Sequence, residues 1–179
     1  MKSSWKFALF AGLILLLAGC QVGGGPVSVA VEHVKQGISL LEQKQYDDAI
    51  TELTAAIQAE PANAQAYAKR AKAYVEKGDA DKAIEDANTA IKYKAGYSEA
   101  FLVLAQALLK KGDAEEAWSK ALTANQTDPT NDETIFWLAM AQKATKRIPQ
   151  AIATFEKFIG VSKNTELVER AMKELAEIK

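Results

Sequence analysis

The 179-residue sequence is poor in the residues that most often carry chemistry, with one cysteine, one histidine and four prolines. A single cysteine, Cys20, excludes a disulfide bond within the chain. The single histidine, His33, has no second histidine or further cysteine with which to form a metal-ligand set. The glycine run Gly23–Gly25 lacks the Lys-Ser/Thr pair that completes a phosphate-binding loop. We therefore expect no cofactor, no metal and no catalytic residue, and we interpret His33 as a structural side chain.

A long hydrophobic run is also missing. The longest one covers Phe7 to Ala18, 12 residues, whereas a helix that crosses a membrane needs about 20. Lys2 and Lys6 precede this run, and small residues end it. A basic flank, a short apolar run and small residues are typical of a secretory signal peptide, which we assign to residues 1–19.

The end of the run, Leu17-Ala18-Gly19-Cys20, resembles the lipobox of bacterial lipoproteins. The resemblance implies that the thiol of Cys20 carries a lipid and that cleavage makes Cys20 the first residue of the mature chain. The alternative is an ordinary cleaved signal with a stray cysteine. Lipoproteins retained at the inner membrane of enteric bacteria tend to carry Asp next, where this chain has Gln21. The resemblance therefore favours a lipid anchor in the outer membrane, facing the periplasm, with a single-membrane cell as the alternative.

Residues 20–29 are expected to form the lipidated cysteine and a glycine-rich tether. The seven residues from Gln21 to Val27 span at most about 25 Å when extended, so the folded body should lie close to the membrane. Charge of neither sign dominates: without Lys2 and Lys6 the chain has 20 basic and 23 acidic side chains. Such a balance makes a poor nucleic-acid binder, and we expect no nucleic-acid partner.

What the sequence does contain is a repeat. The segment Gly78-Asp79-Ala80-Asp81-Lys82-Ala83-Ile84 has close or looser copies around three other alanines, and the four alanines recur every 34 residues as Ala49, Ala83, Ala117 and Ala151. A period of 34 with small residues at fixed places resembles the tetratricopeptide repeat (TPR). The resemblance implies an all-α solenoid in which each unit is a pair of helices, A and B.

We place four units at residues 30–63, 64–97, 98–131 and 132–163, followed by a capping helix in 164–179. The predicted A and B helices are 30–41 and 47–59, 64–75 and 81–93, 99–110 and 115–125, and 133–144 and 149–159. In the capping helix, 165–178, an apolar stripe includes Leu167, Ala171 and Leu175. Its other side is polar, as the exposed end of a repeat array requires.

In TPR proteins one set of A-helix positions lines a concave groove that binds a protein or peptide. The positions that the resemblance assigns to this groove are Val34, Ile38, Leu41, Lys69, Lys72, Leu102, Gln106, Leu109, Phe136 and Met140. The helix from Ile135 to Met140 is apolar on nearly every side, so we expect Phe136 and Met140 to form an exposed apolar patch. The alternative is that the apolar residues of these helices pack against neighbouring helices or a second copy of the protein, namely Val34, Ile38, Leu41, Phe136 and Trp137. Packing is the fate that we expect for Trp137.

The carboxylate clamp is a known TPR site that binds chaperone tails, and the residues at its positions can be compared with those of this sequence. Its positions hold Val34, Ile38, Lys69, Glu99 and Val103. Only Lys69 is cationic, so the sequence does not predict a clamp of that type.

The resemblance as a whole implies a membrane-anchored scaffold of the cell envelope that assists assembly of an envelope complex. Three alternatives stay open at this point. Lipoproteins of this build resemble the pilotins that help secretin subunits of type IV pili to assemble. Self-association through the apolar A-helix faces would make a structural lipoprotein. An enzyme is the alternative from another class, and the sequence offers it no catalytic constellation. The oligomeric state is left undetermined.

Overall fold

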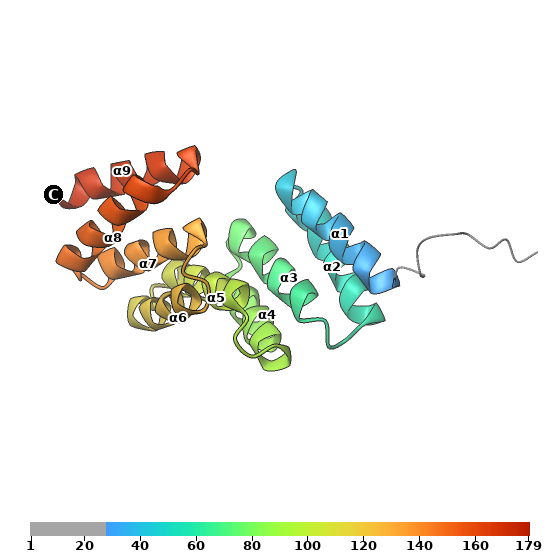
Figure 1. Ribbon diagram of the computed structural model, residues 1–179. Helices are drawn as coiled ribbons and strands as arrows, with labels where there is room; N and C mark the ends of the chain where they lie inside the picture. The colour runs from blue at the N-terminus through green and yellow to red at the C-terminus, as the bar shows by residue number, and fades with distance from the viewer. Residues whose placement is uncertain (1–27) are drawn as a thin grey trace, which may run out of the picture.

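A computed structural model describes residues 28–179, and all its regular structure in this range is helical (Figure 1). The helices are α1 (Val29–Glu42), α2 (Tyr46–Ala59), α3 (Ala64–Lys77), α4 (Ala80–Tyr93), α5 (Ser98–Lys111), α6 (Ala114–Thr127), α7 (Asp132–Ala144), α8 (Ile148–Val161) and α9 (Thr165–Ile178). The predicted all-α solenoid is confirmed, and the helix ends lie within about two residues of those predicted, the usual spread of such boundaries. Each odd-numbered helix up to α7 pairs with the helix that follows it.

Polar side chains mark where many of the helices begin. A helix start leaves backbone N–H groups without partners, and a short polar side chain just before the helix can accept from one of them. The residues that do so are Ser28, Asn63, Asp79, Asn131 and Asn164. These local contacts explain why the helix starts follow so closely from the sequence.

The turn between helices A and B needs one residue in the left-handed region of backbone space. Gly78 (φ 85°) and Gly112 (φ 94°) provide it in the second and third units, where glycine adopts this conformation without strain. Lys44 (φ 60°) and Lys146 (φ 59°) occupy the same place in the first and fourth units. For a residue with a Cβ atom this conformation costs roughly 1–2 kcal/mol. The fold therefore imposes the turn even where the sequence does not favour it.

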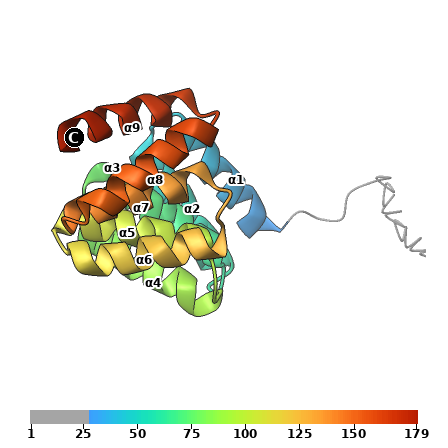
Figure 2. The same cartoon turned by 60° about the vertical axis from the view of Figure 1, so that its left-hand side comes forward.

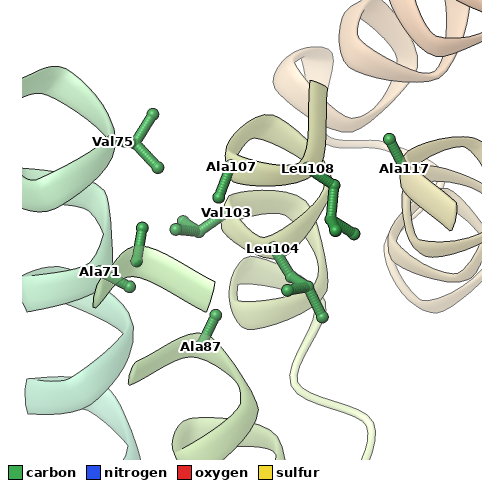
Figure 3. Close-up of a cluster of buried hydrophobic side chains, with 9 residues drawn as sticks. Ala71, Val75, Ala87, Val103, Leu104, Ala107, Leu108 and Ala117 are labelled. Carbon is green, nitrogen blue, oxygen red and sulfur yellow. The ribbon is translucent and has the colours of Figure 1, made fainter. Parts of the chain in front are cut away.

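Small residues lie where the two helices of each unit cross. The alanines of the B helices, Ala49, Ala83, Ala117 and Ala151, are fully buried. Facing them in the A helices are Gly37, Ala71, Ala105 and Ala139, which are also buried. Gly37 has no room for a side chain, because a Cβ atom there would lie 2.6 Å from Cγ of Leu53. Figure 3 shows the central cluster, in which α5 lies between α3 and α6. Val103 of α5 points toward Val75 of α3, and Leu108 of α5 points toward Ala117 of α6.

An ion pair with a buried acid and a largely covered base stands in the second unit. The guanidinium of Arg70 donates to both carboxylate oxygens of Asp86, from Nε at 2.7 Å and Nη2 at 2.8 Å, and to Oγ1 of Thr54 at 2.9 Å. The hydrogen bond to Asp86 raises the pKa of Arg70 above its usual value, although burial opposes this. Arg70 stands at the repeat position where the third and fourth units have the buried Leu104 and Leu138. Its charge is tolerated because Asp86, only 5% exposed, is paired with it.

Ion pairs also connect neighbouring units along one edge of the solenoid. Each pair joins two consecutive units. The base lies at the A–B turn of the later unit, either in the last turn of its A helix or at the start of its B helix. The acid lies in the first turn of the B helix of the preceding unit. The pairs are Lys77–Asp47, Lys111–Asp81 (2.8 Å) and Arg147–Glu115 (2.9 Å). Acids near helix starts also interact favourably with the helix dipole.

The helix α9 packs on α8 and α7 and ends the described stack (Figure 2). Leu167 and Ala171 are buried against the phenylalanines of the fourth unit. The expected polar outer side is only partly correct, because Met172 on that side is 56% exposed. No helix within residues 28–179 is long and apolar enough to span a bilayer.

Candidate partner-binding channel

The A helices form a row, because α1 contacts α3, α3 contacts α5, α5 contacts α7, and α7 contacts α9. Three hollows follow one another along this row, and together we call them the channel. The first hollow, about 160 Å³, lies between α1 and α3 and is lined by Ile38, Leu41, Glu42, Lys69 and Lys72. The two lysines also line the second hollow, so the two hollows are continuous.

The second hollow, about 410 Å³, is polar and is lined by residues of α3, α5 and the start of α7. Its lysines are already paired with acids: Nζ of Lys69 lies 2.5 Å from a carboxylate oxygen of Glu99, and Nζ of Lys72 lies 3.6 Å from one of Glu133. The hydroxyl of Tyr97 donates to the other carboxylate oxygen of Glu99 at 2.8 Å. Burial, together with the charge of Glu99, raises the pKa of Tyr97. This hollow offers hydrogen-bonding groups and little free positive charge.

The third hollow, about 340 Å³, is mainly apolar. Its lining is Gln106, Leu109 and Lys110 of α5, Trp137, Met140, Lys143 and Ala144 of α7, and Glu174 of α9. Nζ of Lys143 lies 2.6 Å from carboxylate oxygens of both Glu174 and Glu177. The hydrogen bond to Glu174, followed by that to Glu177, raises the pKa of Lys143. The hollow can therefore take a bulky apolar group between side chains whose charges are largely balanced.

The predicted groove residues divide into three groups. Those that line the channel and are partly exposed are Ile38, Leu41, Lys69, Lys72, Leu109 and Met140. Leu102 and Gln106 also line it but are almost wholly buried. Val34 packs against Ala56 and Ala66 and lines none of the three hollows. A partner in the channel would thus contact only part of the predicted set.

The prediction that Phe136 contributes to an exposed patch is wrong. Phe136 has no exposed surface, and its ring centroid lies 6.1 Å from those of both Phe155 and Phe158. The guanidinium of Arg170 lies over the ring of Phe136, 4.9 Å from its centroid. Trp137 is the side chain that reaches the third hollow, although part of it also packs against the same cluster. The apolar surplus of α7 is therefore used mainly to hold α8 and α9.

Sequence reasoning missed the pairing of the channel lysines. Glu99 follows Lys69 by 30 residues, and Glu174 follows Lys143 by 31. One repeat period less one helical turn is about 30 residues, so charges of opposite sign at this spacing lie side by side on adjacent A helices. The clamp positions illustrate the result, because the one cation among them, Lys69, is paired with the acid at another of them, Glu99.

His33 lies at the α1–α2 contact, where Nδ1 is 2.6 Å from a carboxylate oxygen of Glu52. This geometry fits the structural role that we expected. Residues 28–179 contain no group of three or more His, Cys, Asp or Glu side chains placed to hold a metal. The predicted signal peptide and Cys20 lie outside the described residues.

The stack of helix pairs with a channel along its A helices defines an α-solenoid. Models of the tetratricopeptide repeat match residues 34–95 and 68–132, and a second such model matches 133–162. The chain belongs to the tetratricopeptide repeat family. A search of curated proteins found no match.

Solved structures support the same assignment. The second TPR domain of human RPAP3, determined with an HSP70 peptide, is 29% identical and covers 66% of this chain and 98% of its own, with a TM-score of 0.60. The TPR domain of Sgt2 from Aspergillus fumigatus is 25% identical over 70% of this chain and 88% of its own, with a TM-score of 0.63. A thermophilic TPR protein of Thermus thermophilus is 20% identical over 82% and 80%, with a TM-score of 0.74, and shows a shared fold.

Proposed function

We propose that this protein is a lipid-anchored scaffold of a bacterial cell envelope that holds a protein partner in its channel. The third hollow is the observation that carries the binding role, because accessible apolar side chains gathered beside polar ones are typical of partner sites. TPR domains solved with HSP70 and HSP90 peptides offer a precedent for peptide binding by this fold. The anchor rests on the lipobox-like sequence that ends in Cys20.

The channel favours a different ligand from a chaperone tail. A free carboxyl terminus is best bound by unpaired cations, but Lys69, Lys72 and Lys143 are each paired with a glutamate. At these three lysines a ligand carboxylate would have to displace the acids; among the channel lysines only Lys110 makes no ion pair within residues 28–179. We therefore propose that the partner binds through apolar side chains of an amphipathic helix or an extended segment, with the third hollow as its main anchor point.

Photo-crosslinking in intact cells tests the binding role. A photoreactive residue placed at Leu41 in the first hollow and at Met140 in the third should capture the same envelope protein. The control position is Ser119, an exposed residue of α6 that lines none of the hollows. Introducing Met140→Glu should abolish capture from Leu41, because a charge in the apolar hollow must be desolvated when the partner binds. Capture of the same protein from Ser119, or capture that survives Met140→Glu, would contradict the proposal.

The same experiment separates the envelope pathways. Capture of a secretin subunit would favour the pilotin-like role, and capture of another assembly factor would assign the scaffold to that complex. The anchor is tested separately. Cys20→Ala should move the protein from the membrane fraction to the soluble fraction, and mass spectrometry should find an acylated amino-terminal cysteine only in the parent protein. A parent protein without acylation would refute the anchor and leave the channel unaffected.

A further inference from the structure

The helix α9 is an A helix whose unit has no B helix in the part of the chain that the structure describes. Its start is capped by Asn164, as α7 is capped by Asn131 and α3 by Asn63. The residue eight positions after the cap is Ala71 in α3 and Ala139 in α7, and both are covered completely by their B helices. The matching residue of α9 is Met172, which is 56% exposed. The surface that receives a B helix in the other units is therefore open here.

An apolar hollow of about 370 Å³ lies at this open surface. It is lined by Glu156 and Ile159 of α8 and by Met172, Leu175, Ala176 and Lys179 at the end of α9. Met172 is among the most exposed large apolar side chains of residues 28–179. Leaving such a surface in water gives up the burial that a second helix would provide.

The pattern of side chains on this surface is symmetrical along the helix. Glu169, Met172, Ala176 and Lys179 are exposed and follow one another at spacings of 3, 4 and 3 residues, which places them on one face of α9. The spacing is the same in either chain direction. If an identical helix lies antiparallel across this face, Met172 meets Ala176 of the other copy, and Glu169 meets its Lys179. A large side chain then faces a small one, and an acid faces a base.

We propose that two copies of this chain associate about a two-fold axis through α9, with the partner's α9 taking the place of a fifth B helix. The antiparallel arrangement agrees with the rest of the fold, because helices joined by a short turn run antiparallel. A two-fold contact uses the same patch on both copies. The Met172–Ala176 contact and the Glu169–Lys179 pair therefore each occur twice. The occupant is thus a second copy of this protein, bound at the end of the solenoid on the face of α9 opposite Glu174, which lines the third hollow.

One contact within the monomer competes for Lys179. Its Nζ lies 2.8 Å from a carboxylate oxygen of Glu156, and both side chains are about half exposed, 52% and 53%. Exposed pairs of this kind contribute little, so the pair does not hold Lys179 away from a second copy. A contact made mainly by one short helix from each copy buries less than the roughly 1,600 Å² of a standard interface. We therefore expect a dissociation constant in the micromolar range.

Sedimentation equilibrium of the full chain, in a detergent matched to the solvent density, measures this association directly. The protein mass should rise from monomer to dimer across the micromolar range. Met172→Glu should leave a monomer at every concentration tested. The matched control is Val31→Glu, because Val31 is also exposed but lies on α1 at the other end of the solenoid. At protein concentrations below the dissociation constant, circular dichroism melts of both variants should equal that of the parent, since both positions are on the surface.

Charge exchange supplies a second test with its own internal control. Glu169→Lys and Lys179→Glu should each weaken association by about fivefold, because each places like charges opposite one another. The two substitutions together should restore it, since the charges are then exchanged and again opposite in sign. A parent protein that stays monomeric, a dimer indifferent to Met172→Glu, or a double variant without recovery would each overturn the proposal. None of these results would affect crosslinking from the channel.

Discussion

The second and fourth units share one backbone arrangement but fill their cores differently. Phe136, Phe155 and Phe158 of the fourth unit stand at the repeat positions that hold Ala68, Ala87 and Ala90 in the second, and all six side chains are fully buried. The fourth unit is filled by aromatic rings. The second has a small-residue core with the buried Arg70–Asp86 ion pair beside it.

The comparison shows which positions the repeat requires and which it leaves free. The alanines at the helix crossing, Ala71 with Ala83 and Ala139 with Ala151, are the same in both units. The positions around them vary widely in volume, and the next helix compensates at one place only. Ala171 of α9 lies against the aromatic core where the larger Leu104 of α5 lies against the alanine-rich core. One turn earlier the sizes are reversed, with Leu167 of α9 against the aromatic core and Ala100 of α5 against Ala68 and Ala90.

The largest expected effect comes from emptying the aromatic core. Phe155→Ala places in the fourth unit the alanine that the second unit has at this position. The neighbouring side chains of the fourth unit do not fill the space that the ring leaves, so the free energy of unfolding should fall by about 4 kcal/mol. Chemical denaturation followed by circular dichroism measures this change. Val161→Ala removes apolar volume from an exposed position of the same helix and should change stability little. Equal losses for the two variants would contradict the core assignment.

The next effect concerns the ion pair of the second unit. Asp86→Ala leaves the Arg70 guanidinium nearly buried without its partner, and we expect a loss of about 3 kcal/mol. Replacing both residues, as Arg70→Met with Asp86→Leu, should recover most of this loss, because apolar side chains of similar volume can replace a buried pair. If the double variant is as unstable as Asp86→Ala, the residues act in some way other than as a pair.

A smaller effect tests the positions that both units share. Ala83→Leu should overpack the helix crossing and lower stability by about 2 kcal/mol, and Ala151→Leu should do the same in the fourth unit. Ala153→Leu, at an exposed position of α8, makes the same chemical change without a crowded neighbour. Thermal melts of the three variants should therefore separate the first two from the third. An Ala83→Leu variant that melts like the parent would refute the close approach.

The smallest effect distinguishes the turns. Lys146→Gly relieves the left-handed strain of the fourth unit and should stabilise the protein by about 1 kcal/mol, partly offset by the greater flexibility of glycine in the unfolded chain. Gly112→Lys, the reverse change in the third unit, should destabilise it by a similar amount. Denaturant midpoints of the two variants should move in opposite directions, and a shift of the same sign would contradict the argument.

Much of the fold could be predicted because its signals are local or periodic. The 34-residue spacing of alanines predicted the crossings, and capping side chains such as Asn63 and Asp79 are local features that stand where helices begin. Gly37 belongs to the same series as Ala71, and its absent side chain is explained only by the 2.6 Å approach of Leu53. The need for a glycine at this position depends on how α1 and α2 pack against each other, so the sequence of α1 alone does not predict it.

The candidate site was less predictable for a physical reason. Leu109 and Met140, which the resemblance assigned to the groove, line one hollow, whereas Phe136, assigned to the same groove, is buried. Whether a side of α7 is exposed depends on the size of side chains on α8 and α9, which a pattern along α7 does not contain. The pairing of the channel lysines, by contrast, is visible in the sequence, because a glutamate follows each lysine at a spacing of about 30 residues, in Lys69–Glu99 and in Lys143–Glu174.

The ion pairs along the edge of the solenoid have a mechanical consequence. Lys77–Asp47, Lys111–Asp81 and Arg147–Glu115 join successive units at the same relative place and are largely open to solvent. Each is weak and is screened by salt, but all of them resist the same movement of one unit against the next. The protein should therefore behave as an elastic spring whose stiffness along this edge falls as ionic strength rises. Small-angle scattering at increasing salt should record a longer molecule, while the helix content stays constant.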